Sequence, residues 1–141
     1  MTDDLARRAV ACKHWHWTPG MRSEIRTRTR RAAYRWLAQP TDGRCYGIVA
    51  IVEDKHGRPC RNVATLQPGP DDLPDLTDPA TLGCLLALVR EAWGDPCICT
   101  AVDNTSAGWW VDGWTAARPQ VPSDLHPTEA AALVAALEAA P

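Results

Sequence analysis

One helix is specified at both of its ends and along its inner face, between Asp78 and Gly94. Asp78 is a good N-cap, Pro79 fits the first helical position, and Gly94 fits the position just past the end. Five apolar residues follow at spacings of three, four and seven: Leu82, Leu85, Leu86, Val89 and Trp93. Burying five such side chains contributes on the order of 10 kcal/mol before conformational entropy is counted. The sequence therefore predicts that this helix anchors the core.

Alternating residues before this helix predict strands. Residues 13–17 alternate polar and aromatic side chains and predict a short strand, which the turn Thr18-Pro19-Gly20 ends. Residues 24–31 alternate arginine with Ile and Thr, and they predict a β-ribbon with one cationic face. Residues 32–37 fit either an extension of that strand or a helical turn.

Two hairpins are predicted from β-branched segments around turns. Residues 45–52 form the clearest strand, and a turn at residues 54–57 folds them back onto residues 61–66. Residues 97–102 and 109–115 flank a polar loop and predict the second hairpin.

Two further helices complete the predicted fold. Residues 2–11 have acids first and arginines later, which matches the helix dipole. A final helix runs from about Thr128, as N-cap, to Ala139, with Ala130, Leu133, Val134 and Leu137 facing inward. This order predicts an α+β fold, an antiparallel sheet of hairpins packed by an N-terminal, a central and a C-terminal helix. We expect one domain over residues 1–141: a basic strand-rich part (1–66), a linker (67–78) and an acidic helix-hairpin-helix part (79–141).

Charge is divided along the chain. Residues 1–62 hold thirteen of the fifteen Lys and Arg against six Asp and Glu, and the other residues hold two against eleven. Such a division creates a local field that steers partners of opposite charge. The longest apolar run, Leu82 to Val89, is far shorter than the ~20 residues that span a bilayer. We expect no membrane partner, and the acidic N-terminus predicts no secretory signal and hence a cytoplasmic protein.

Cysteine and histidine occur at spacings that raise the question of a metal. Cys12, His14 and His16 share one face of the predicted strand, and Cys97-Ile98-Cys99 repeats the spacing. Structural zinc sites use C-x₂₋₄-C and H-x₃₋₅-H spacings instead. The pattern therefore favours two half-buried strands without a metal over a zinc site, and we expect no cofactor.

The remaining cysteines and the known motifs do not indicate catalysis. Cys45 and Cys60 lie on strands predicted to pair, but a reducing compartment favours free thiols. Cys84 fits a small core residue. The spacing assembles no nucleophile with a base and an acid, and the sequence has no P-loop, G-x-S-x-G or H-E-x-x-H motif. We expect a protein that is not an enzyme.

The candidate binding residues are arginines on the predicted ribbon together with one tryptophan: Arg22, Arg26, Arg28, Arg30, Arg31, Arg35 and Trp36. The planar donor fork of arginine suits both phosphates and carboxylates. Nearby Trp15, Trp17 and Tyr34 have rings that can stack on unpaired bases. The alternative is a solvated strand face that protects a sheet edge or pairs with the acidic half of the same chain.

Three segments resemble a family of small phage and prophage accessory proteins to which no activity is attached. They are AC-x-x-W-x-W-x-PGM at residues 11–21, LTDPATLGCLLALVREAWG at residues 76–94 and PTEAAALVAALE at residues 127–138. The resemblance implies a viral accessory protein in the cytoplasm of a bacterial host. Small phage proteins of this kind commonly bind and block host machinery, including CRISPR effector complexes.

Two functional hypotheses follow. The first is a non-enzymatic phage protein that inhibits a host macromolecule, an anti-CRISPR-like inhibitor whose partner is a host protein or ribonucleoprotein complex. In it, an acidic surface imitates DNA phosphates, or the arginines hold an acidic protein surface or guide RNA. The second is a DNA- or RNA-binding accessory protein that uses the arginine-rich ribbon. A metal-dependent or thiol enzyme is a third and lesser alternative.

Overall fold

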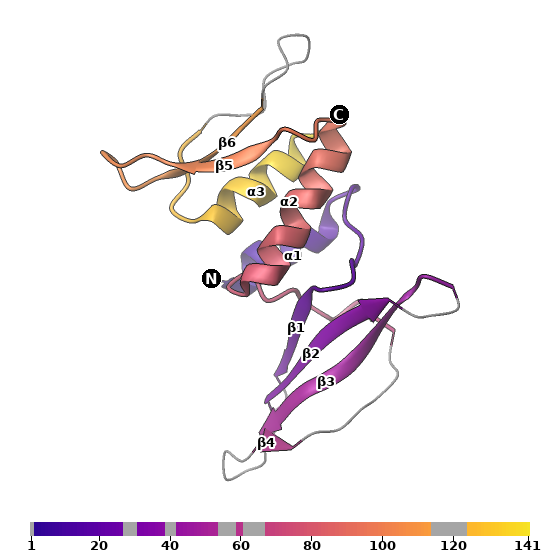
Figure 1. Cartoon of the computed structure of the whole chain (residues 1–141). Helices are drawn as coiled ribbons and strands as arrows, with labels where there is room; N and C mark the ends of the chain where they lie inside the picture. Colours follow the sequence, from indigo (N-terminus) through magenta and orange to yellow (C-terminus); the bar gives the residue numbers. More distant parts are fainter. Residues whose placement is uncertain (1, 27–30, 39–41, 54–58, 61–66, 114–123) are drawn as a thin grey trace. The chain divides into compact units, whose positions relative to one another are not determined.

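A computed structural model describes residues 2–26, 31–38, 42–53, 59–60, 67–113 and 124–141, and within these ranges the chain is α+β as predicted (Figure 1). The helices are α1 (Thr2–Ala11), α2 (Pro79–Trp93) and α3 (Glu129–Glu138). The strands are β1 (Arg22–Arg26), β2 (Arg31–Ala38), β3 (Cys45–Glu53), β4 (Pro59–Cys60), β5 (Cys99–Val102) and β6 (Trp109–Asp112). The hairpins belong to two antiparallel sheets, one with the order β1-β2-β3-β4 and one of β5-β6. Contacts divide the chain into two compact units, residues 17–84 and residues 1–16 with 85–141.

The unit of residues 17–84 is built on the sheet β1-β2-β3-β4. The predicted run 24–31 is divided, because β1 ends at Arg26 and β2 begins at Arg31, directly opposite it in the register. Residues 32–37, which the sequence left ambiguous, are part of β2. The strand predicted at 45–52 is confirmed by β3, and β4 pairs with its end. The turn predicted at 54–57 and the strand predicted at 61–66 lie outside the described residues. The two residues of β4 lie between these two segments.

Residues 67–78, predicted as a linker, lie against β1. Ser23 forms an antiparallel bridge with Pro74, and the Asp75 N–H donates to the Arg22 carbonyl at 2.7 Å. Leu76 in the same segment is buried. This segment therefore belongs to the unit of the sheet and places its carboxylates beside the first strand.

The unit of residues 1–16 and 85–141 is built around α3. Figure 1 shows α3 along one face of β5-β6, and α3 contacts both of these strands and α1. The four residues predicted to face inward from α3 are all buried: Ala130, Leu133, Val134 and Leu137. Thr128 is the N-cap, since its side-chain oxygen accepts from the Ala131 N–H at 3.1 Å.

The helix α2 begins and ends as predicted. The Thr81 N–H donates to Asp78 Oδ2 at 2.9 Å, and Gly94 adopts a φ of 60° just past the last turn. Of the predicted apolar stripe, Leu85, Val89 and Trp93 are buried, whereas Leu82 and Leu86 are half-buried. Both predicted end residues therefore mark the ends of this helix, whereas only part of the predicted apolar stripe is fully buried.

The strand predicted at residues 13–17 is wrong. The chain instead leaves α1 through tight turns, in which the Cys12 N–H donates to the Ala9 carbonyl and the Trp15 N–H donates to the Cys12 carbonyl. Such bonds satisfy carbonyl groups at the end of a helix, which have no intrahelical partner. Alternation over five residues was too short a signal to outweigh this effect.

Candidate functional site

The seven predicted binding residues separate into two groups along the ribbon β1-β2. Arg22 lies opposite Arg35 in the register, with Trp36 next to Arg35, and Arg26 lies opposite Arg31 at the other end. Arg28 and Arg30 lie outside the described residues. In the first group, the two arginines pair with acids of the same chain, which was the alternative considered from the sequence, and Trp36 has a core role that the sequence did not identify. A binding role for the second group stays a prediction.

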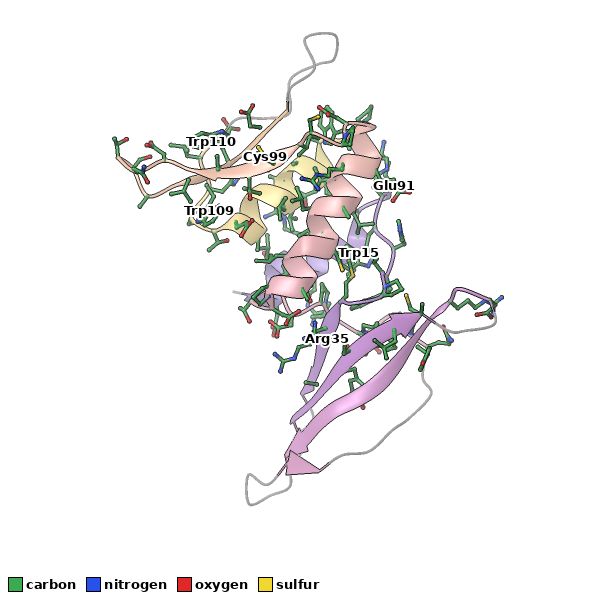
Figure 2. All side chains as sticks on the ribbon, in the orientation of Figure 1. Trp15, Arg35, Glu91, Cys99, Trp109 and Trp110 are labelled. Carbon is green, nitrogen blue, oxygen red and sulfur yellow. The ribbon has the colours of Figure 1, made fainter. Side chains whose placement is uncertain are left out.

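Arg22 and Arg35 form ion pairs with carboxylates of their own unit. Arg35 is labelled in Figure 2. Arg22 Nη1 donates to Asp75 Oδ2 at 3.0 Å. Arg35 binds Asp78 with two bonds, Nη1 to Oδ2 at 2.7 Å and Nη2 to Oδ1 at 2.9 Å. The side chains of Asp75 and Asp78 are only 9% and 10% exposed. Pairing with the chain's own acids, one of the alternatives considered from the sequence, therefore holds for these two arginines.

Asp78 combines this ion pair with the N-cap of α2. Hydrogen bonding from Arg35 lowers the pKa of Asp78 to about 2, and bonds from the backbone and hydroxyl of Thr81 act in the same direction. The Asp78 carboxylate in turn raises the pKa of Arg35. One carboxylate therefore connects β2 to the first turn of α2.

The lowered pKa predicts how stability depends on pH. Because the folded-state pKa of Asp78 is about 2 against an ordinary 3.8, its contribution is complete above about pH 5 and is lost as pH falls through 2. The difference between these two pKa values corresponds to at most about 2.5 kcal/mol. Bonds from Ser106 and Thr105 also lower the pKa of Asp103 to about 2, so the comparison must isolate Asp78.

Urea unfolding of wild type and Asp78→Asn at pH 6, 4 and 3 isolates this contribution. We expect the difference in free energy of unfolding between the two proteins to shrink as the pH falls. A difference that stays constant over this range would show that the charge of Asp78 does not stabilise the fold.

Trp36 is a core residue. Its side chain is 1% exposed, and its indole N–H donates to the buried Ser23 Oγ at 3.1 Å. The ring stacks on Tyr34 at 6.2 Å between centroids and lies tilted against Trp17 at 5.6 Å. Across the register stands Gly47, where an added Cβ would come within 3.1 Å of the ring. A ring enclosed in this way is not accessible for stacking on an unpaired base of a nucleic acid in the folded protein.

The division of charge is smaller in the folded units than along the chain. Residues 17–84 hold ten Lys and Arg against eight Asp and Glu, and the other unit holds five against nine. The difference arises because the acids of residues 67–78 fold with the arginines. What matters for binding is therefore where unneutralised charge remains within each unit.

The predicted metal ligands do not share a strand face, because residues 13–17 form no strand. Cys12 Sγ donates to the Leu137 carbonyl at 3.4 Å, and His14 Nε2 is hydrogen-bonded to the Pro141 carbonyl at 3.0 Å. Among the residues that the structure describes, no three of His, Cys, Asp and Glu come together as a metal site. Cys45, which the sequence allowed to pair with Cys60, is a free thiol.

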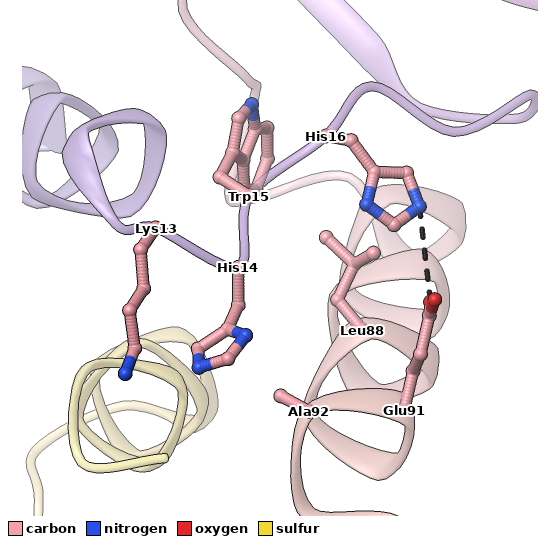
Figure 3. Close-up of a pocket in the computed structure, with 7 residues that line it drawn as sticks. All are labelled: Lys13, His14, Trp15, His16, Leu88, Glu91 and Ala92. Carbon is pink, nitrogen blue, oxygen red and sulfur yellow. Dashed lines mark ion pairs between the residues drawn. The ribbon is translucent and has the colours of Figure 1, made fainter. Parts of the chain in front are cut away.

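A cavity of about 350 Å³, which the sequence did not predict, lies beside α2 (Figure 3). It is lined by Lys13, His14, Trp15, His16, Leu88, Glu91 and Ala92. His16 Nε2 lies 3.8 Å from Glu91 Oε2, and both side chains are largely exposed. The lining offers an ammonium group, two imidazoles and a carboxylate next to apolar Leu88 and Ala92, which suits a small polar ligand. The sequence feature that could have indicated this cavity is the spacing of Leu88, Glu91 and Ala92, which places all three on one face of the predicted helix.

No protein-family model, no curated protein and no solved structure matches this chain. None of the described helices has the length and apolarity needed to cross a bilayer.

Proposed function

We propose that this chain is a non-enzymatic, phage-encoded protein that binds and inhibits a host macromolecule, namely a bacterial defence complex of the CRISPR type. The observation that supports binding is the distribution of arginines along β1-β2. Arg22 and Arg35 are neutralised at one end of the ribbon, and Arg26 and Arg31 stand opposite each other at the other end.

The segment from Arg26 to Arg31 has the composition of a binding element. It holds four arginines in six residues, with Arg28 and Arg30 between the paired ends and no acidic residue among them. Guanidinium groups bind phosphates and carboxylates with paired hydrogen bonds, so such a segment suits guide RNA or an acidic protein surface. Binding of this kind requires no bond to be made or broken in the target.

Inhibition is tested by plating a phage on bacteria whose CRISPR system restricts it, with and without this chain. We expect the wild-type chain to restore plaque formation and Arg26→Ser/Arg28→Ser/Arg30→Ser to lose this effect. The matched control is Arg7→Ser/Arg8→Ser/Arg44→Ser, which removes the same charge from exposed positions outside the cavity and should remain active. Failure of the wild-type chain to relieve restriction in a panel of CRISPR types would contradict inhibition.

Direct binding of DNA or RNA is the second candidate, and the same four-arginine segment favours it. Four phosphate contacts predict that the logarithm of affinity falls with the logarithm of salt with a slope of about −3.6, or roughly 100-fold between 50 and 200 mM. Fluorescence anisotropy with labelled duplex and single-stranded oligonucleotides measures this slope. Tight, salt-dependent binding of free nucleic acid would support the second candidate, and its absence would favour a protein or ribonucleoprotein target.

A further inference from the structure

The cavity beside α2 lies within a single unit of the fold. Its lining residues come either from residues 13–16 or from α2 between Leu88 and Ala92, and both segments belong to the unit of residues 1–16 and 85–141. The volume of about 350 Å³ is near the lower limit of small-molecule pockets, which measure about 300–1,000 Å³. This volume suits a small molecule.

Both walls of the cavity are held by α3 and the residues directly after it. On one side, His14 Nε2 is hydrogen-bonded to the Pro141 carbonyl at 3.0 Å. On the other side, the buried Trp93 of α2 donates its indole N–H to the Ala136 carbonyl at 2.8 Å. The walls are therefore fixed before any ligand binds, which is typical of small-molecule sites.

The cavity has an apolar interior and a charged rim. Leu88 is only 3% exposed and lies one helical turn before Ala92, on the same face of α2. Lys13, His16 and Glu91, by contrast, are exposed. Figure 3 shows Lys13 on one side and Glu91 on the other, with the two apolar side chains of α2 between them. A ligand that fits this arrangement has an apolar part and carries charges of both signs.

The opposite charges at the rim distinguish this site from one for a simple anion or cation. Glu91 Oε2 lies 3.8 Å from His16 Nε2, which is longer than a hydrogen bond, so this carboxylate can accept from an ammonium group of a ligand. The ammonium group of Lys13 can donate to a carboxylate. Glu91 would repel a ligand that is only an anion, and Lys13 would repel one that is only a cation.

We propose that this cavity binds a small apolar α-amino acid as its zwitterion. The side chain of the amino acid lies against Leu88 and Ala92. Its carboxylate accepts from Lys13 Nζ, and its ammonium group donates to the Glu91 carboxylate. The cavity and Arg26 lie in different units, so this proposal and the proposed function fail independently.

Titration of the ¹⁵N-labelled full-length chain with L-leucine, followed by NMR, tests the proposal. We expect saturable shifts of the amide signals of residues 13–16 and 88–92, with a Kd of about 1 mM or tighter. The signals of residues outside the lining should move less. Shifts that do not saturate by about 20 mM L-leucine, or that are largest away from the lining residues, would overturn the proposal.

Two variants and two derivatives of leucine assign the charge contacts. Lys13→Gln and Glu91→Gln should each weaken binding of L-leucine about fivefold, the upper range for an exposed ion pair. Leucinamide lacks the carboxylate, so Lys13→Gln should bind it no more weakly than wild type does. N-acetyl-leucine lacks the ammonium group, so Glu91→Gln should bind it no more weakly than wild type does.

Arg7→Gln is the matched control for these variants. It removes an exposed charge of the same unit outside the cavity and should bind L-leucine as wild type does. Equal binding of L-leucine by wild type, Lys13→Gln and Glu91→Gln would overturn the proposal.

Discussion

Trp36→Ala is expected to lower the free energy of unfolding by about 3–5 kcal/mol, the range for deleting a buried aromatic ring. The ring is 1% exposed and fills the space that Gly47 leaves across the sheet. Its removal opens a cavity and leaves the buried Ser23 hydroxyl without the indole N–H that it accepts. Urea unfolding followed by circular dichroism measures the change.

Two related variants distinguish the contribution of ring packing to stability from that of the hydrogen bond. Ser23→Ala leaves the indole N–H of Trp36 without its acceptor and should cost about 1–3 kcal/mol. Trp36→Phe keeps most of the ring, so its loss of unfolding free energy should fall between those of Ser23→Ala and Trp36→Ala. A stability loss below about 1 kcal/mol for Trp36→Ala would contradict the core role and would return Trp36 to the candidate binding residues.

Asp78→Ala is expected to lower the free energy of unfolding by about 3 kcal/mol. About 1 kcal/mol of this is the hydrogen bond of an uncharged N-cap, and the rest is the charge of Asp78, which acts on Arg35 first and also on Thr81. The loss combines both effects because one carboxylate oxygen, Oδ2, accepts from both Thr81 and Arg35.

Asp78→Asn is the matched variant for this prediction. Asparagine is as good an N-cap as aspartate, so Asp78→Asn should lose only the contribution of the charge. Its stability should therefore lie between wild type and Asp78→Ala. Equal stability of wild type and Asp78→Ala would show that neither interaction matters to the fold.

The helices were predictable because their signals are local. Asp78, Gly94 and Thr128 act within one turn of their own positions, and the structure confirms all three as caps or end residues. The strand β3 was predictable for a similar reason, its β-branched composition. The order of these elements was sufficient for the α+β class.

The sequence could not show which carboxylates pair with Arg22 and Arg35, or that Trp36 is a core residue, because these contacts are with residues distant in the chain. Asp75 lies 53 residues after Arg22, and Asp78 lies 43 residues after Arg35. Alternation in a single strand does not show which of its charges will meet a carboxylate. Counting charges along the sequence overestimated the charge difference between the two folded units for the same reason. It assigned these arginines and the acids that neutralise them to different parts of the chain.

The central claim is that the chain binds a host macromolecule through the segment from Arg26 to Arg31. Its most direct test is quantitative capture from host lysate at moderate salt, with tagged wild type, Arg26→Ser/Arg28→Ser/Arg30→Ser and the control Arg7→Ser/Arg8→Ser/Arg44→Ser. We expect wild type and control to retain the same partner and the first variant to lose at least about tenfold, or about 1.4 kcal/mol. Equal retention of that partner by all three proteins, with equal thermal stability, would contradict the claim.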